Sequence, residues 1–282
     1  CSRKVQDPED FAALDELHQH LKSDEKLLSS HAESLAEIFL IRAKLFANQG
    51  DAKKAIADCE TASGIAPESP LLFDRIGEVY VIAGQWKEAI LAFSRALALD
   101  QKDVIAIQRL GNCLLSSGDE AAYRKHCREM LKYHAATDNP AIAGAVARCF
   151  TYHAWPEGDL KTPLALARLA MDQSNSNAWD QYCYGALLYR AGRYEEARKQ
   201  LAEALTRQAD KPHGNWLFYL AMTHHALGEA EQANEFFKRG EKWFAEQQNR
   251  KPIQKQRREE AKQLLSAAHT ESDGPAVSTN KQ

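Results

Sequence analysis

Large apolar and small residues recur along this chain at helical spacing. In the clearest stretch they are Phe73, Ile76, Gly77 and Tyr80, followed by Ala89, Phe93 and Ala96. Side chains three and four positions apart share one face of an α-helix. The pattern predicts two consecutive helices that pack antiparallel, because large side chains fill the space beside the small ones.

The same pattern returns with a period of 34 residues. Gly50 and Gly84 are 34 positions apart, as are Ala55 and Ala89. Each glycine is expected to end the first helix of its unit, since glycine tolerates positive φ. The copies span residues 36–69, 70–103, 104–137, 178–211 and 214–247, and the third departs from the pattern after Gly118.

These residues resemble the tetratricopeptide repeat, a helix–turn–helix unit of 34 residues. The resemblance covers about residues 36–247. It implies an all-α fold, a right-handed superhelical solenoid of about six antiparallel helix pairs with capping helices. More narrowly, the chain resembles the repeat tails of large bacterial proteins, which often follow a serine/threonine kinase domain or a WD-repeat propeller.

The remaining segments complete this array. Residues 138–177 are interpreted as a diverged repeat, with helices over 141–152 and from Pro163 to Met171 that are separated by a break at 156–158. Capping regions are expected at both ends, and the tail is expected to be disordered. Their ranges are 1–35 for the N-terminal cap, 248–268 for the C-terminal capping helix and 269–282 for the tail.

Composition narrows the classes of function. The chain of 282 residues has 36 Lys and Arg against 39 Asp and Glu, a net charge of −3. Proteins that grip nucleic-acid phosphates normally carry a basic excess, so no nucleic-acid partner is expected. No apolar run approaches the length of about 20 residues that a transmembrane helix needs.

The six cysteines suggest a compartment. Five are dispersed singly and are expected to be buried and reduced, which favours the cytoplasm. Cys1 leaves an alternative open, because bacterial lipoproteins begin at an acylated cysteine and are often periplasmic. In that case the chain would be a lipid-anchored envelope-assembly factor.

No catalytic or metal-binding motif is present. The chain lacks a Gly-x-Ser-x-Gly elbow, a phosphate-binding loop and a His-Glu-x-x-His pair. Neighbouring residues on a helix point about 100° apart, so His224 and His225 are poorly placed to share a metal ion. We therefore expect no enzyme activity, no metal and no cofactor.

In tetratricopeptide arrays the first helices of successive units line a concave groove that binds partners. Carrying this geometry over places the candidate partner-binding residues at Gln108, Asn112, Trp179, Tyr182, Tyr189, Phe218, Met222 and His225. Aromatic side chains with polar atoms are common anchors at such surfaces. Packing of the same aromatics against the C-terminal capping helix is the competing interpretation.

The expected C-terminal capping helix contains a cluster of basic residues. It carries a basic run that includes Arg257 and Arg258, interleaved with Glu259 and Glu260. We interpret it as a solvated cap rather than a patch for an acidic partner. The sequence thus predicts a non-catalytic protein-interaction scaffold with a protein or peptide partner, the alternatives being the lipid-anchored factor and the regulatory tail of a serine/threonine kinase.

Overall fold

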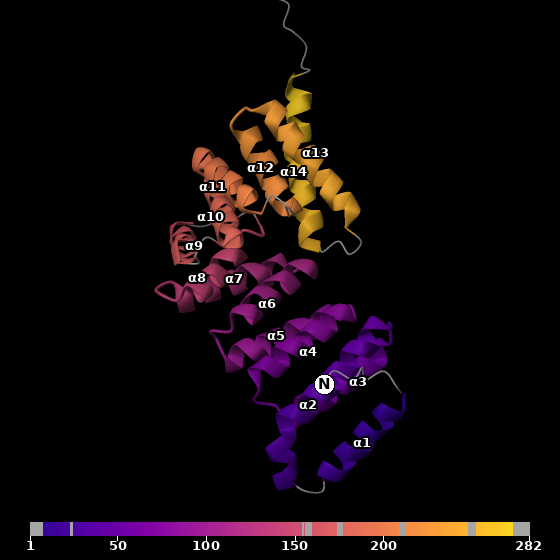
Figure 1. Ribbon diagram of the computed structural model, residues 1–282. Coiled ribbons are helices and arrows are strands. Elements are labelled where there is room, and N and C mark those ends of the chain that lie inside the picture. Colours follow the sequence, from indigo (N-terminus) through magenta and orange to yellow (C-terminus); the bar gives the residue numbers. More distant parts are fainter. Residues whose placement is uncertain are drawn as a thin grey trace, which may run out of the picture. The chain divides into compact units, whose positions relative to one another are not determined.

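The chain folds as a series of α-helices (Figure 1). The computed structural model describes residues 8–22, 25–153, 155, 160–173, 177–208, 213–247 and 252–272. No strand occurs in these ranges, and the prediction of an all-α fold of helix pairs is confirmed. Within the same ranges, no helix has the length and apolar character needed to span a membrane.

The helices group into two compact units, residues 1–123 and 124–282. We call them the N-terminal and C-terminal units. The repeat pattern predicted one quasi-linear array, and the division falls in the first turn of α7 (Glu120–His134), inside the expected third repeat. That copy keeps its pattern only as far as Gly118.

The N-terminal unit pairs its helices as the repeat pattern predicts. α2 packs antiparallel on α3, α4 packs on α5, and α4 also contacts both helices of the first pair. The helices before α7 are α1 (Pro8–Lys22), α2 (Glu25–Asn48), α3 (Ala52–Ile65), α4 (Pro70–Ile82), α5 (Trp86–Leu99) and α6 (Val104–Ser116).

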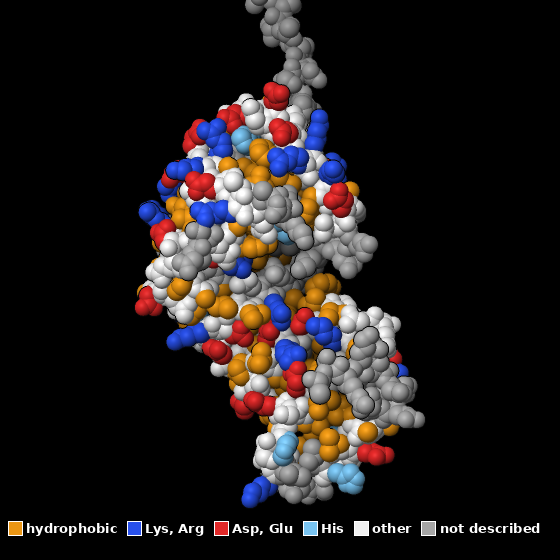
Figure 2. Space-filling model, viewed as in Figure 1, with side chains coloured by type: hydrophobic (Ala, Val, Ile, Leu, Met, Phe, Trp, Pro, Cys, Tyr) orange, Lys and Arg blue, Asp and Glu red, His pale blue; other side chains and the backbone are white. Residues whose placement is uncertain are grey.

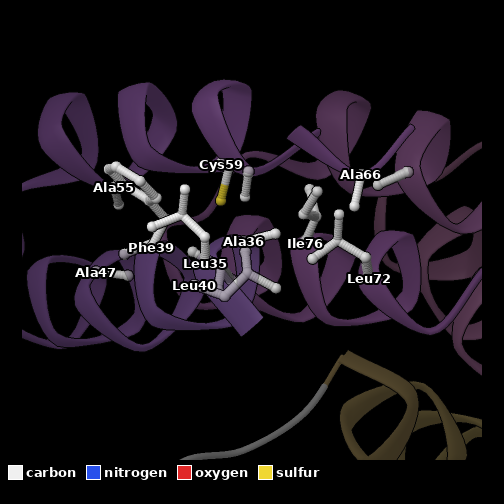
Figure 3. Close-up of a cluster of buried hydrophobic side chains, with 14 of the residues drawn as sticks. Leu35, Ala36, Phe39, Leu40, Ala47, Ala55, Cys59, Ala66, Leu72 and Ile76 are labelled. Atoms are coloured by element: carbon white, nitrogen blue, oxygen red, sulfur yellow. The ribbon is translucent and has the colours of Figure 1, made fainter. Parts of the chain in front are cut away.

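One apolar layer holds the first helices of this unit together. Figure 3 shows Phe39 of α2, Cys59 of α3 and Ile76 of α4 within the same layer. Each of these three side chains is at most 2% exposed. A large apolar side chain buried this fully, such as Phe39 or Ile76, stabilises the fold by about 1.5–3 kcal/mol, so this layer contributes to holding adjacent pairs together.

The α2 helix begins earlier than the repeat boundary suggests. The first repeat was expected to open at Ala36, yet α2 starts at Glu25. No Gly or Pro interrupts residues 25–36, so nothing in the sequence ends the helix there. α1 packs on α2, and Arg42 of α2 donates to both carboxylate oxygens of Asp58 at 2.8 and 2.7 Å and to Asp15 of α1 at 2.9 Å.

The C-terminal unit repeats the pairing. α8 packs on α9, α10 on α11 and α12 on α13, while α14 contacts both α12 and α13. The helices after α7 are α8 (Pro140–Cys149), α9 (Lys161–Gln173), α10 (Ala178–Arg190), α11 (Tyr194–Arg207), α12 (Gly214–Ala226), α13 (Ala230–Glu246) and α14 (Pro252–Ser272). The last helix therefore runs past the expected end at residue 268.

Glycines with positive φ occur at the turns that the repeat period predicts. Gly84 and Gly192 both have φ of +74°, which confirms that these glycines turn the chain after a first helix. The five cysteines in the described ranges are buried, as predicted, and none of them forms a disulfide there. Cys1, the expected break at 156–158 and the tail after Ser272 lie outside the described residues.

Candidate functional site

The first helices of the N-terminal unit present a shared face, which we call the N-terminal face. A pocket and a set of ion pairs join its residues on α2, α4 and α6, namely Glu33, Glu37, Lys44, Leu71, Asp74, Arg75, Glu78 and Arg109. We include Ile105, Gln108 and Asn112 of α6, because they lie 34 positions after Leu71, Asp74 and Glu78. Ion pairs cross it from helix to helix. Lys44 pairs with Glu78 at 3.1 Å, and Arg109 pairs with Asp74 at 2.6 Å. Arg75 also pairs with Glu37.

Two buried oxygen atoms on this face lack a hydrogen-bond partner. Asp74 is 3% exposed, and only its Oδ2 accepts a hydrogen bond, from Arg109. Its Oδ1 and the Oδ1 of Asn112 have none. Burial raises the pKa of Asp74 to about 6, against the opposing effect of Arg109. A buried acceptor without a donor is costly, so these two atoms lower the stability of the N-terminal unit.

Exposed apolar side chains lie on the same face. Leu71 is 62% exposed and Ile105 is 48% exposed, and they occupy equivalent places in successive repeats. Beside Leu71 is a pocket of about 440 Å³, lined by Glu33, Ser34, Glu37, Ala66, Ser69, Pro70, Leu71 and Leu72. Figure 2 shows acidic, basic and apolar side chains interleaved over one side of this unit.

The C-terminal unit contains a cluster of aromatic rings, which we call the aromatic cluster: Trp179, Tyr182, Tyr189, Trp216 and Tyr219. Tyr182 stacks on Trp216 with ring centroids 5.3 Å apart. Tyr219 meets Tyr182 and Tyr189 edge to face at 5.8 and 5.6 Å. Its hydroxyl donates to the carbonyl of Thr151 at 2.6 Å. Edge-to-face and offset-stacked pairs are favourable, so these contacts stabilise the unit.

Helix α14 lies against this cluster through Arg257. The guanidinium is 4.4 Å from the Tyr219 ring centroid and donates to the carbonyls of Thr151 and Tyr152 at 2.5 and 3.0 Å. Arg257 is only 2% exposed. It also pairs with Glu260, whose Oε2 accepts from Arg190 at 2.9 Å. Burial alone would raise the pKa of Glu260, but Arg257 and Arg190 lower it to about 2.

The predicted partner-binding residues fall into two groups. Tyr182, Phe218 and Met222 are buried. Phe218 packs on Phe237 of its own helix pair with ring centroids 5.9 Å apart, so it belongs to the core. The partly exposed members are Gln108, Asn112, Trp179, Tyr189 and His225. Gln108 and Asn112 are half-buried residues of α6 in the N-terminal unit, and the aromatic residues other than Phe218 belong to the cluster contacted by α14.

Sequence reasoning missed the importance of Arg257. The basic run was interpreted as a solvated cap, whereas Arg257 is buried and Arg258 pairs with Glu241, its Nη2 lying 2.7 Å from Oε2. Lys255 is exposed as expected. The spacing of Arg257 and Glu260 marks a helical ion pair, but the sequence does not say which side of the helix is buried.

Two buried histidines contact side chains of the same unit rather than a ligand site. His224 contacts Glu229 at 2.5 Å, and His18 packs edge to face on Phe39 at 5.1 Å. No group of three or more His, Cys, Asp or Glu able to hold a metal ion occurs within the described ranges.

A family model described as tetratricopeptide repeat matches residues 185–246. The fold is similar to PilW, a type IV pilus biogenesis factor, with a TM-score of 0.53 and 16% identity over 78% of this chain and 97% of that one. It is also similar to a tetratricopeptide repeat protein from Parabacteroides merdae, with a TM-score of 0.52 and 14% identity over 86% and 94% of the two chains.

A third similar structure is a thermophilic tetratricopeptide repeat protein of Thermus thermophilus, with a TM-score of 0.50 and 15% identity over 70% of this chain and all of that one. No curated protein matches the sequence. At these identities the structures establish similarity of fold.

Proposed function

Because this chain carries tetratricopeptide repeats, we propose that it is a non-catalytic scaffold that binds a segment of a partner protein. The proposed binding surface is the N-terminal face. We choose this face because its apolar residues remain exposed beside a pocket. The aromatic cluster of the C-terminal unit, in contrast, is already contacted by α14. Exposed apolar surface next to a concavity is typical of interaction sites.

Affinity capture with matched variants tests this function. Leu71→Asn and Leu91→Asn change side chains of similar exposure, 62% and 70%, and only Leu71 lies on the N-terminal face. We expect partners captured by the full chain to be lost with Leu71→Asn and retained with Leu91→Asn. An identical set of captured proteins with both variants would contradict the proposal.

We also propose that the chain works in the cytoplasm. Five buried cysteines that form no disulfide among the described residues support a reducing compartment such as the cytoplasm. Mass spectrometry of the intact N-terminus tests the lipid-anchored alternative directly, because acylation adds a defined mass to Cys1.

A further inference from the structure

The N-terminal unit carries a strong acidic excess. Residues 1–123 contain 13 Lys and Arg but 20 Asp and Glu, a formal charge of −7, although the whole chain has only −3. Such an excess attracts basic segments and repels acidic ones. The charge by itself does not identify a site, but the N-terminal face adds two local features.

The first feature is the pocket beside Leu71. Its wall includes the carboxylate of Glu33, which is exposed and forms no ion pair with any described residue. Its other lining includes Pro70 and Leu71, which are apolar. A Lys or Arg side chain has both parts needed here, an aliphatic stem for Leu71 and a cationic end for Glu33.

The start of α4 lies at the same pocket, and a helix N-terminus disfavours cations. Two details weaken that opposition. Pro70 has no backbone N–H, and the side chain of Ser69 already accepts from the backbone N–H of Leu72 at 3.4 Å. Glu33 and Glu37, on the neighbouring α2, supply negative charge at the pocket.

The second feature is the repetition of apolar exposure at Leu71 and Ile105, one on each of two successive first helices. We propose that the partner segment recognised by the N-terminal face is basic, with Lys or Arg side chains alternating with apolar ones. A cation binds at Glu33, and the apolar side chains pack on Leu71 and Ile105. This inference rests on the proposed function and names the class of partner.

Peptides of equal length test it with the full chain. A peptide alternating Lys with Leu, one alternating Gln with Leu and one alternating Glu with Leu are titrated by fluorescence anisotropy. The Lys peptide should bind most tightly, and its affinity should fall as salt is raised. We expect Glu33→Gln to weaken its binding about two- to fivefold and Leu71→Asn to weaken it about tenfold.

Glu60→Gln and Leu91→Asn are the matched controls, because both side chains are exposed and lie on α3 and α5, outside the N-terminal face. They should leave the affinity unchanged. Tighter binding of the Gln or Glu peptide with the same dependence on Leu71 would overturn the basic preference and leave the proposed function standing. Binding of the Lys peptide that is insensitive to both Glu33→Gln and Leu71→Asn would place it elsewhere and overturn the inference.

Discussion

At the scale of single residues, close helix packing depends on positions where a side chain would not fit. A Cβ on Gly77 of α4 would lie 2.5 Å from the ring of Phe93 in α5, and one on Gly185 of α10 would lie 2.9 Å from Leu201 in α11. Gly77 belongs to the repeat pattern described above, and Gly185 holds the same place in the copy at residues 178–211. The sequence could identify them because the packing of one helix pair is a local property of each unit.

Gly77→Ala is therefore expected to destabilise the chain. The new methyl group must displace the Phe93 ring, which should lower the free energy of unfolding by about 1–3 kcal/mol in urea denaturation. Gly64→Ala is the matched control, since nothing lies within 4 Å of a Cβ at Gly64 in α3. That change should be neutral or stabilising by up to about 1 kcal/mol. Equal effects of the two substitutions would contradict the packing argument.

Asp74 gives a prediction about pH. Its pKa is about 6 in the folded chain against an ordinary value of 3.8, mainly through burial. The folded state thus binds this proton more tightly than the unfolded state does. Stability from this group is present below about pH 4 and is lost as the pH rises through about 6. Its surroundings carry the charges of Arg75, Glu78, Asp103 and Arg109.

Asp74→Asn removes this titration. The free energy of unfolding of the variant, relative to the native chain, should rise by up to about 3 kcal/mol between about pH 4 and pH 7. Denaturation in urea at several pH values measures this difference, which is unaffected by groups that titrate equally in both proteins. A difference independent of pH would show that Asp74 titrates normally.

At the scale of helices, the sequence predicted the existence of each element better than the side it buries. The helical spacing identified Tyr182 and Phe218 as equivalent groove positions, yet Tyr182 joins the aromatic cluster and Phe218 packs on Phe237. Gly240 accounts for part of this difference, because its missing side chain leaves room for the Phe218 ring. Such compensation depends on two helices at once, so the periodicity of one helix does not reveal it.

Helix α14 is expected to depend on Arg257. Arg257→Ala would leave the carbonyls of Thr151 and Tyr152 without this donor and Glu260 without one of its two arginines. Loss of one partner from a buried charged group costs about 3–5 kcal/mol. Hydrogen exchange in α14 should accelerate strongly.

Two other substitutions complete that experiment. Lys255→Ala removes an exposed charge from the same helix and should leave hydrogen exchange unchanged. Arg257→Lys keeps the charge but loses the forked geometry of the guanidinium, so an intermediate acceleration is expected. Slow exchange in α14 with Arg257→Ala would show that its apolar contacts suffice without this arginine.

At the scale of the whole molecule, the period of 34 residues predicted the helix pairs, but the sequence did not predict the division into two units. Their charges differ in sign, −7 for residues 1–123 and +4 for 124–282. The net charge of the whole chain, −3, does not reveal this difference between the units. The two candidate surfaces also differ, since the aromatic cluster is contacted by α14 and the N-terminal face keeps Leu71 and Ile105 exposed.

The buried cysteines allow the two units to be followed separately during unfolding. Cys59 and Cys113 lie in the N-terminal unit, and Cys149 and Cys183 lie in the C-terminal unit. Burial raises the pKa of Cys59, Cys113 and Cys183 to about 12, so their thiols should resist alkylation at neutral pH until they are exposed.

In repeat proteins a local change acts mainly on its own neighbours. Gly77→Ala should therefore lower the urea concentration at which Cys59 and Cys113 become labelled, with a smaller effect on Cys149 and Cys183. Gly185→Ala should produce the reverse order. Pulse alkylation followed by peptide mass spectrometry measures each site. Identical shifts at all four cysteines would show that the chain unfolds as one cooperative body despite its two units.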